Sequence, residues 1–425
     1  MARNVGCSHN LESRISAEVE RRRSELVGFT QDMVRTESLS GQEKELAALI
    51  SERMKGLGYD YVEIDETGNV VGVVGGKPEK DSLMFNGHMD HVPPGDMPDP
   101  YSGEIKDGSV FGVPGQVIVG RAASDMKGAL AAMIVAGSVL RDLGLKLERR
   151  LIVAGVVLEE TNGLGSRYLA ERGPRPGGVV IGESTDLDVA LGHRGSIGVA
   201  ITTEGLSCHA SAPERGINAL YKMVPILEGV RRKAGDLPSH PALGKSSMVA
   251  TTISASPNIK NVLPNLCTVG LDVRNTPNFV SEDVLRTLHT IVKEAQAKDT
   301  ELKATVELQR RKLRCYTGYE REVEASTPPF FTNKKTALAQ MTKDVIDRVL
   351  RRKAGFKVWT FATDGCYFAD QGIPTVGFGP GEERFAHSRT DNIKIDDLIA
   401  SAKVYAALAA DFCQYANDRH ENSQH

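Results

Sequence analysis

Short apolar runs alternate with segments of helical pattern through the first part of the chain, and this alternation limits the possible folds most. Residues 70–74, 151–158 and 179–182 are apolar runs of the kind found in buried strands. Segments of helical spacing, 126–143 and 166–171, separate several such runs. This order predicts an α/β fold with a mixed, largely parallel sheet.

The N-terminal segment is predicted to be helical. Apolar residues over about 11–35 are spaced for one buried face, so we expect one long helix there. Ser40 and Glu43 fit a capping box at the start of a second helix. Two further strands are expected at 62–65 and 82–85.

From about residue 195 the expected order of elements changes. It becomes strand, helix, two strands, helix and strand, at 197–203, 217–233, 248–255, 266–274, 280–298 and 303–309. The first pattern then resumes, with helices at 336–352 and 395–415 and strands at 357–361 and 375–378. We therefore expect a main domain formed by 1–194 and 313–425, with a βαββαβ domain, 195–312, inserted into it.

Length and composition exclude several classes of protein. At 425 residues and 46.0 kDa, two domains are expected. The net charge of −3 favours neither nucleic acid nor an anionic membrane as a partner. We expect no signal peptide and no membrane span, and the six scattered cysteines form no C-x-x-C pair. A cytoplasmic protein with reduced thiols is the prediction.

Acids and histidines follow several of the expected strands. They are His88 and Asp90, the pair Glu159 and Glu160, Glu183, and His387, while Asp125 begins a helix. Each alone has a simpler explanation, such as a hydrogen-bonded histidine, a helix cap or a surface acid. Ligands of open α/β sheets bind outside the carboxyl ends of the strands, however, and isolated buried carboxylates are costly. The coincidence therefore predicts a shared cation.

The spacing of His88 and Asp90 adds a second expectation. Residues two apart in an extended segment point to the same side. Asp90 could then hold the imidazole of His88, as carboxylates often do for a metal-binding histidine.

Taken together, these motifs resemble one known family. The matching pieces are Gly87-His-Met-Asp, Gly120-Arg-Ala-Ala-Ser-Asp-Met-Lys-Gly, Glu159-Glu160, Gly182-Glu-Ser, Cys208-His-Ala-Ser-Ala-Pro, Asn261-Val-Leu-Pro, Asp272-Val-Arg and Phe385-Ala-His. In order and spacing they resemble the di-metal metallopeptidase family of aminoacylases, acetylornithine deacetylase and succinyl-diaminopimelate desuccinylase. The resemblance spans about residues 80 to 400.

The resemblance implies a ligand set for two divalent metal ions. Asp125 would bridge them, His88 and Glu183 would complete one site, and Glu160 and His387 would complete the other. Mixed carboxylate and imidazole ligands suit zinc, with manganese or cobalt as alternatives.

Two further roles follow from the resemblance. Asp90 would orient His88, and Glu159 would act as the general base for a water between the metals. The chemistry agrees, because two metal ions acidify a shared water and a nearby carboxylate can move its proton to the leaving nitrogen.

The resemblance also assigns functions to the inserted domain, namely closure over the site and dimerisation. His209 would enter the partner subunit's site and donate to the developing oxyanion; the alternative is an ordinary loop histidine. A small carboxylate-bearing substrate is expected. The candidates to hold it are Arg194, Asn261, Arg274, Thr363 and Gly365. For Arg274, a surface charge is an equal alternative.

Three features depart from the family pattern or leave a choice. His91 stands beside His88, and a hydrogen-bonded loop histidine is its simpler interpretation. The run after His387 lacks the usual glutamate. Aromatic residues at Phe330, Phe331 and 359–368 indicate either core packing or a flat pocket for a planar acid.

The sequence thus predicts a metal-dependent hydrolase that cleaves the amide bond of an N-acyl or N-carbamoyl amino acid or of a short peptide. A hydrolytic deaminase of a small aromatic amino acid, using the same metals and releasing ammonia, is the alternative. A non-catalytic binding protein on the same fold is a third, disfavoured because Glu159, Glu160 and His387 are all present.

Overall fold

A mixed eight-stranded sheet forms the body of the protein, in a computed structural model that describes residues 5–78 and 81–414. Its order is β1-β2-β6-β3-β7-β21-β8-β20, and β6, β3, β7 and β21 run parallel in its centre. The strands are β1 Tyr61–Ile64, β2 Val70–Val74, β3 Leu83–His88, β6 Leu151–Val156, β7 Gly178–Ile181, β8 Val189–Ala190, β20 Phe356–Lys357 and β21 Thr375–Gly377. The predicted fold class is confirmed.

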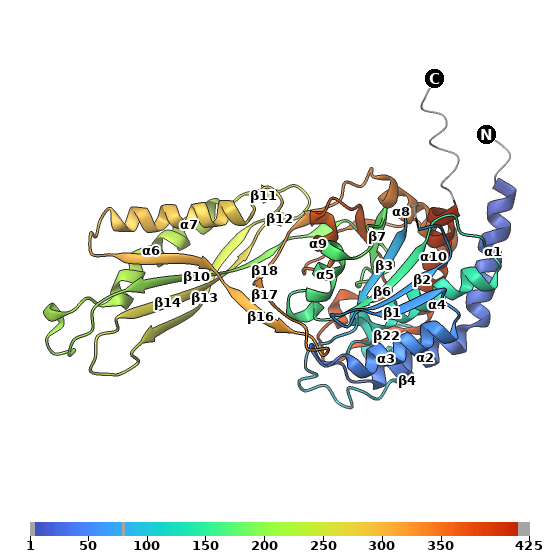
Figure 1. Cartoon of the computed structure of the whole chain (residues 1–425), viewed down its shortest axis with the longest axis horizontal. Coiled ribbons are helices and arrows are strands. Elements are labelled where there is room, and N and C mark those ends of the chain that lie inside the picture. The colour runs from blue at the N-terminus through green and yellow to red at the C-terminus, as the bar shows by residue number, and fades with distance from the viewer. Residues whose placement is uncertain (1–4, 79–80, 415–425) are drawn as a thin grey trace, which may run out of the picture.

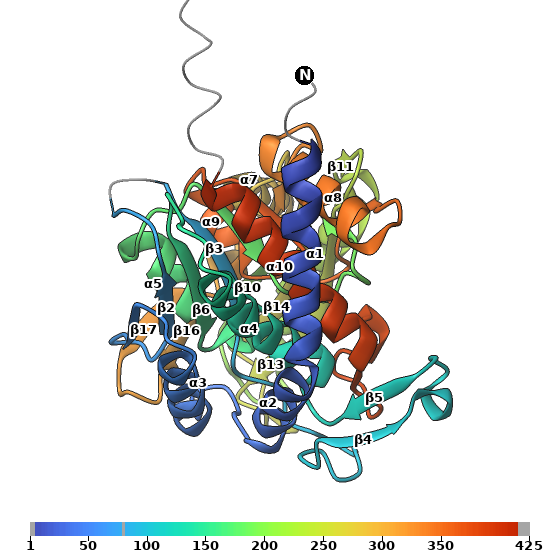
Figure 2. The same cartoon turned by 90° about the vertical axis from the view of Figure 1, so that its right-hand side faces the viewer.

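Two layers of helices enclose this sheet (Figure 1). Side chains alternate along the strands, so that Leu83 and Phe85 pack on the layer of α4 and α10, whereas Met84 packs on that of α5 and α9. Figure 2 shows α1 and α2 on the outside of the first layer. The helices are α1 Val5–Arg21, α2 Arg23–Arg35, α3 Lys44–Gly56, α4 Gly128–Asp142, α5 Leu164–Arg172, α8 Ala337–Leu350, α9 Gly365–Asp370 and α10 Ile395–Gln414.

One helical stretch, 123–142, is long and apolar enough to cross a membrane by length and composition. The apolar window that meets this criterion is entirely buried inside the protein. It contains α4, which packs against α10 and the sheet. This stretch is therefore the central core helix of the main body.

The second sheet is antiparallel, with the order β13-β14-β10-β15, and β18 pairs with the start of β10. Helices α6 and α7 pack on one of its faces, giving the expected βαββαβ order and a separate lobe (Figure 1). The elements are β10 Ser196–Glu204, α6 Ala219–Lys233, β13 Ser247–Ser256, β14 Leu266–Arg274, α7 Ser281–Gln296, β15 Lys303–Leu308 and β18 Ser326–Thr327. We call this lobe the lid.

The lid has its own hydrophobic core. Its buried residues lie between Ile197 and Leu302. The largest core of the main body draws on residues up to Leu191 and again from Leu313 onward. This separation supports the division at 194/195 and 312/313, which remains our proposal.

Two expectations for the N-terminal part were wrong. The long first helix is broken at Arg22, whose buried guanidinium turns towards Ser138 (Nη1 to Oγ, 2.7 Å) and Asp142 of α4. No capping box forms at α3. The Ser40 hydroxyl instead donates to Asp90, 50 positions along the chain, so a long-range bond replaces the local one.

Three other elements differ from the prediction. The strand expected at 357–361 is only the two-residue β20, and Trp359 beyond it is buried in the core on the α5 and α9 side of the sheet. A three-stranded sheet and a hairpin were not predicted. They are β4 Glu104–Asp107, β5 Gln116–Val119 and β22 Asn392–Lys394, and β16 Arg310–Arg314 with β17 Glu320–Glu324. Their strands are short and mostly polar, so the sequence gives no strong strand signal.

Candidate metal centre and active-site cavity

The five predicted metal ligands meet at the carboxyl end of the central strands. His88 is the last residue of β3, Glu160 follows β6 and Glu183 follows β7. Asp125 precedes α4, and His387 lies in the loop between β21 and β22. Parallel neighbours end at the same edge of a sheet, and this brings distant residues together.

His88, Asp125 and Glu183 form one group that could hold a metal ion. One donor atom from each lies within 4.8 Å of the others, and all three side chains are buried. The Nε2 atom of His88 is 3.1 Å from Oδ1 of Asp125 and 3.4 Å from Oε1 of Glu183.

Asp125, Glu160 and His387 form the second group, with the same 4.8 Å limit. The Nε2 atom of His387 is 3.2 Å from Oδ2 of Asp125 and 2.9 Å from Oε1 of Glu160. Asp125 therefore turns one carboxylate oxygen to each group, as a residue that bridges two cations would.

The electrostatics of the two groups fit a pair of divalent cations. Oε2 of Glu183 is buried without a hydrogen-bond partner among the described residues. Burial and the nearby Asp125 carboxylate raise the pKa of Glu183 to about 8. Hydrogen bonds to Asp125 and Glu160 raise the pKa of His387 to about 10. Buried negative charge thus demands compensation here, and carboxylate and imidazole are suitable donors for zinc, manganese or cobalt.

The Asp90 carboxylate does not hydrogen-bond to His88 as the sequence predicted. The Nδ1 atom of His88 lies 2.9 Å from the main-chain oxygen of Asp90, whereas the Asp90 carboxylate is 3.8 Å away. That carboxylate instead accepts from the main-chain N–H groups of Glu159 (3.0 Å) and Glu160 (3.1 Å) and from the Ser40 hydroxyl (2.6 Å). Asp90 therefore ties the His88 segment to the loop that carries both glutamates.

Asp391 performs a similar task, which the sequence did not reveal. Its carboxylate accepts from the N–H groups of Ala122 (2.7 Å) and Ser124 (2.9 Å), and the Arg121 guanidinium lies 3.4 Å away. Burial raises the pKa of Asp391 to about 7. The unusual run after His387 thus still supplies an acid, and it fixes the turn that carries Asp125.

Left-handed backbone conformations cluster around the ligands. Ala122, Leu158 and His387 have φ angles of 65°, 60° and 57°. Residues other than glycine adopt this region rarely, and such strain is typical of functional sites. Here it lies at or within three residues of Asp125, Glu159 and His387.

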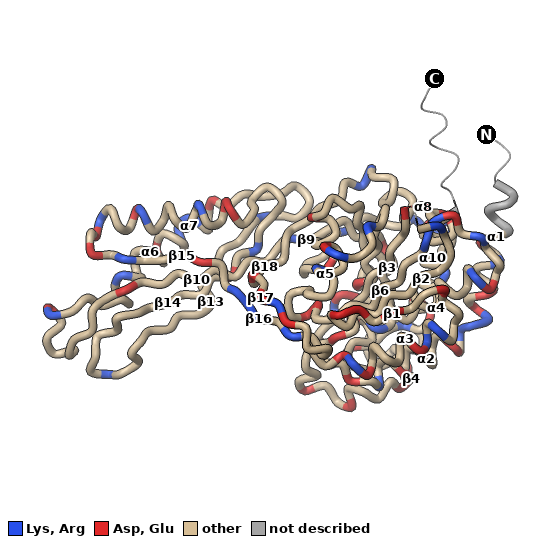
Figure 3. The backbone as a smooth tube through the Cα atoms, viewed as in Figure 1, with Lys and Arg blue, Asp and Glu red and all other residues tan. Residues whose placement is uncertain are grey.

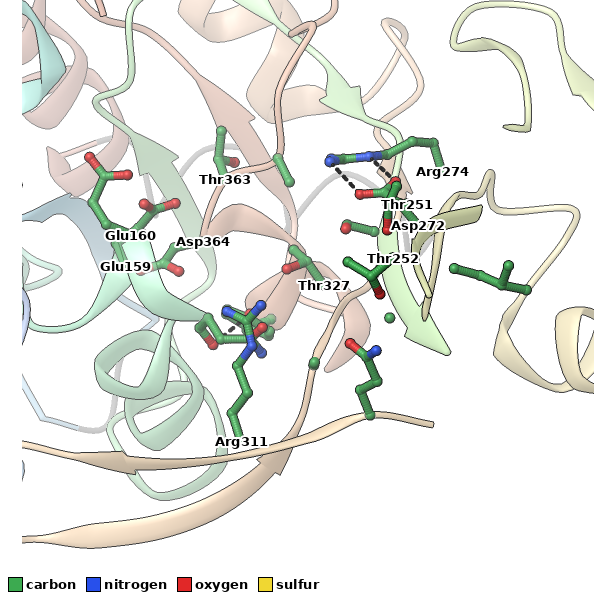
Figure 4. A pocket seen from close by; sticks show the side chains of 18 residues that line it. Glu159, Glu160, Thr251, Thr252, Asp272, Arg274, Arg311, Thr327, Thr363 and Asp364 are labelled. Carbon is green, nitrogen blue, oxygen red and sulfur yellow. Dashed lines mark hydrogen bonds and ion pairs between the residues drawn. The ribbon is translucent and has the colours of Figure 1, made fainter. Parts of the chain in front are cut away.

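A cavity of about 400 Å³ opens beside these residues, between the main body and the lid (Figure 4). Glu159 and Glu160 line it from the metal side, and Arg274 lines it from the lid. Other polar lining residues are Asn162, Ser196, Thr251, Thr252, Asp272, Gln309, Arg311, Thr327, Thr363 and Asp364. The cavity can accept a polar ligand of small-molecule size next to the metal centre.

Glu159 is half-buried and lines the cavity. Burial, together with the neighbouring Asp364 carboxylate, raises the pKa of Glu159 well above its ordinary value. Asp364 is itself buried, with Oδ2 lacking a partner among the described residues. A carboxylate in such surroundings is a stronger proton acceptor than one in water.

The predicted substrate-binding residues are only partly brought together. Arg274 and Thr363 line the cavity, and Arg274 donates to Asp272 through Nε (2.8 Å) and Nη2 (3.1 Å). Gly365 is buried outside the lining, and its N–H donates to Oγ1 of Thr363 (3.3 Å). Arg194 lies outside the lining and donates to the main-chain oxygen of Lys245.

His209 and Asn261 lie at the other end of the lid. His209 bridges to Val262, and the Ala210 N–H donates to the Asn261 oxygen. The His209 loop follows the Glu204 end of β10, and Asn261 lies in the loop between β13 and β14 at the same end, because Glu204 pairs with Leu266. The Ser196 end of β10 borders the cavity. A nine-residue strand is roughly 26 Å long, so neither side chain reaches the cavity of its own chain.

The remaining candidates are structural. Nε2 of His91 accepts from the Ser38 N–H (3.0 Å) and Nδ1 donates to the Val92 oxygen (2.8 Å), so His91 is the expected hydrogen-bonded loop histidine. Phe330, Trp359 and Phe368 are buried in the core. Of the aromatic residues in question, Tyr367 borders the cavity, which gives little support to a flat aromatic pocket.

Comparison with known proteins yields a consistent result. Residues 84–411 match the sequence profile of Peptidase family M20/M25/M40. Uncharacterized protein YgeY of Escherichia coli (strain K12) is 32% identical over 392 residues, covering 91% of this chain and 94% of that protein. Succinyl-diaminopimelate desuccinylase of Helicobacter pylori (strain G27) is 25% identical over 349 residues, covering 78% and 80%.

The same fold occurs in a solved structure of a putative aminohydrolase from methicillin resistant Staphylococcus aureus. It aligns with a TM-score of 0.76 and 15% identity, and covers 95% of this chain and 100% of that one. The matched region includes every residue of the metal centre and of the cavity lining described above.

Proposed function

The chain belongs to Peptidase family M20/M25/M40, the metal-dependent hydrolases of amide and peptide bonds, and on this premise we propose that it hydrolyses N-acyl or N-carbamoyl amino acids or short peptides. The family resemblance seen in the sequence is confirmed. The observation that supports the proposal best is the pair of ligand groups that share Asp125 beside a polar cavity.

In this proposal two zinc ions bind the five ligands, with manganese or cobalt as alternatives. His88, Asp125 and Glu183 would hold one ion, and Asp125, Glu160 and His387 the other. When bound, such a pair acidifies a shared water and polarises the scissile carbonyl. The buried Oε2 of Glu183, which has no hydrogen-bond partner among the residues described, is an available donor.

The protein's own residues carry the proton and orient the substrate. The Glu159 carboxylate would accept a proton from the attacking water and deliver it to the leaving nitrogen. Thr363 and Arg274 border the cavity and would hold the substrate's polar groups. Arg274 keeps free N–H donors for a carboxylate, because its two bonds to Asp272 leave Nη1 unused.

We further propose a homodimer formed through the lid. β13 is an edge strand that exposes Val249 and Ile253, and such edges commonly pair with another chain. Leu220, Tyr221 and Val224 add exposed apolar surface on α6. In this dimer, His209 and Asn261 would enter the partner's cavity.

The other interpretations have less support. A deaminase is not favoured, because the family description refers to peptidases and the desuccinylase relatives are named for removing an acyl group. A non-catalytic protein does not fit the family or the complete ligand set. A cytoplasmic location stays a proposal; the cysteines whose side chains the structure describes, 208, 267, 315, 366 and 413, are free, as reduced thiols would be.

Glu159→Gln tests the proposal directly. We expect two metal ions per chain to remain bound and kcat to fall by about 10²- to 10⁴-fold, because the amide cannot accept a proton. Elemental analysis gives the metal content and product chromatography gives the rate. Turnover at the wild-type rate in this variant would refute Glu159 as the general base. Loss of the metals would show that Glu159 is itself needed for metal binding.

A further inference from the structure

The hairpin β16–β17 sorts its charges onto two faces. Three cations of β16 lie opposite glutamates of β17: Arg310 opposite Glu324, Lys312 opposite Glu322, and Arg314 opposite Glu320. Side chains alternate along a strand, so Arg311 and Leu313 point to the other face. On that face Leu313 packs into the core of the main body.

Arg311 differs from the other cations of this hairpin. Arg310 pairs with Glu322 (3.6 Å), and Lys312 and Arg314 pair with Glu320 (2.5 and 3.7 Å). In β17, Arg321 pairs with Glu171 (2.7 Å). Figure 3 shows these basic residues as a blue stretch where the lid meets the main body. Within the described part of the chain, the Arg311 guanidinium has neither an ion pair nor a hydrogen bond, while its main chain pairs with Val323 of β17.

The unpaired guanidinium borders the active-site cavity. Arg311 and Arg274 are the two arginines of its lining, and Arg274 already has a carboxylate partner in Asp272. In Figure 4 the Arg311 side chain rises from β16 towards the space between Asp364 and Thr327. The cavity therefore contains a cation with all its donors free.

Contacts with the main body hold the hairpin in place. The Tyr316 hydroxyl donates to the Gly68 oxygen (3.1 Å), and the Thr317 hydroxyl donates to the Glu66 oxygen (2.7 Å). Arg321 makes two bonds to Glu171, at 2.7 and 3.0 Å. Arg311 thus starts from a fixed backbone, which lowers the entropic cost of binding a ligand.

We propose that Arg311 determines substrate specificity by binding a second carboxylate, remote from the scissile bond. The planar guanidinium offers two parallel N–H donors to the two oxygens of a carboxylate. This inference rests on the proposed function and narrows its substrate class. The preferred substrate is an acylated amino acid or short peptide that carries two carboxylates.

Matched substrates test this in turnover. N-glutaryl-L-alanine is compared with N-pentanoyl-L-alanine, and N-acetyl-L-glutamate with N-acetyl-L-glutamine, so that each pair differs by one carboxylate. We expect the wild type to prefer the dianion in at least one pair, and Arg311→Met to lower that ratio of kcat/KM by about 10- to 100-fold. Arg310→Met removes the adjacent cation of the outer face and should leave the ratio unchanged.

Calorimetry tests it without turnover. The metal-loaded wild type should bind glutarate more tightly than pentanoate, and Arg311→Met, but not Arg310→Met, should abolish the difference. A preference that survives in Arg311→Met, or no preference in the wild type by either method, overturns the inference. If no amide is cleaved but calorimetry shows that tighter binding of glutarate depends on Arg311, the proposed function is refuted and the carboxylate site is supported.

Discussion

The metal centre and the His209 loop of the lid present their polar groups in opposite ways. His88, Asp125 and Glu183 are buried, and one donor atom from each lies within 4.8 Å of the others. His209, by contrast, is exposed, and its ring nitrogen Nδ1 bonds to the neighbouring Ser211. Folding of one chain thus assembles the ligands, whereas His209 lies too far along the lid to reach the cavity of its own chain. The comparison indicates that metal binding and the assembly of two chains can be changed by separate substitutions.

Asp125→Ala should have the largest effect, because it removes a ligand from the metal centre. Loss of the shared ligand removes a donor from both groups, so we expect both metals to be lost and turnover to fall by about 10⁴-fold or more. Elemental analysis and activity assays measure the two effects. The oligomeric state in ultracentrifugation should not change, and Glu214→Ala, an exposed lid acid, serves as the control. A fully metallated Asp125→Ala protein would contradict the bridging role.

His209→Ala should lower the catalytic rate without changing metal binding. We expect metal content to stay at the wild-type level while kcat falls by about 10²- to 10³-fold, the usual effect of losing an oxyanion donor. Kinetics and elemental analysis on the same sample separate the two.

Complementation sharpens this prediction. Refolding His209→Ala together with an equal amount of Glu159→Gln should restore about one quarter of the wild-type activity, because half of the dimers then contain one intact composite site. Failure of the mixture to exceed either variant alone would show that His209 does not act across a dimer.

Asp391→Asn should weaken the metal centre without removing a ligand. The new amide can accept only one of the two N–H bonds from Ala122 and Ser124, so the turn before Asp125 loosens. We expect metal affinity to fall by about 10- to 100-fold, measured by competition with a chromophoric chelator. An unchanged affinity would reduce Asp391 to a purely structural residue.

His193, at the junction of main body and lid, gives the smallest effect, and it concerns stability. Its Nδ1–H donates to the Arg194 oxygen and its Nε2 accepts from the Thr363 N–H, and burial lowers its pKa to about 4. Since its unfolded pKa is about 6.5, its contribution is fully present above pH 6.5 and is lost as the pH falls towards 4.

Urea unfolding of the wild type and of His193→Gln should measure this loss. The stability difference between them should shrink by about 2 kcal/mol from pH 7 to pH 5, since each pKa unit corresponds to about 1.4 kcal/mol. A difference that does not vary with pH would mean that His193 titrates normally at the junction.

The sequence predicted the parts of the site that follow from strand ends. His88 ends a strand, Glu183 directly follows an apolar run and Glu160 comes two residues after one, and parallel strands bring such residues to one edge. The family resemblance added Asp125 and His387. The lid's order of elements was also readable, because its strands and helices have strong periodic patterns.

The parts that escaped prediction depend on long-range contacts. Asp391 bonds to an N–H group 269 positions away, and no local pattern marks such a partner. Arg311 differs from Arg310 only through the register of a polar hairpin that the sequence did not reveal. The Asp90 carboxylate was expected to hydrogen-bond to His88. The main-chain N–H groups of Glu159 and Glu160, after β6, lie closer to it.

The most direct test of the central claim is a mass-spectrometric product screen in ¹⁸O-labelled water. Zinc- and manganese-loaded protein is offered N-acyl amino acids, N-carbamoyl amino acids, dipeptides and aminobenzoates. We predict that one amide class yields a free amino acid and that Glu159→Gln abolishes the reaction. From an N-acyl amino acid or a dipeptide, the carboxylate formed at the cleaved bond should carry one ¹⁸O, whereas an N-carbamoyl amino acid should give carbon dioxide and ammonia beside the amino acid. Ammonia released from an aminobenzoate, with all the amides intact, would contradict the account.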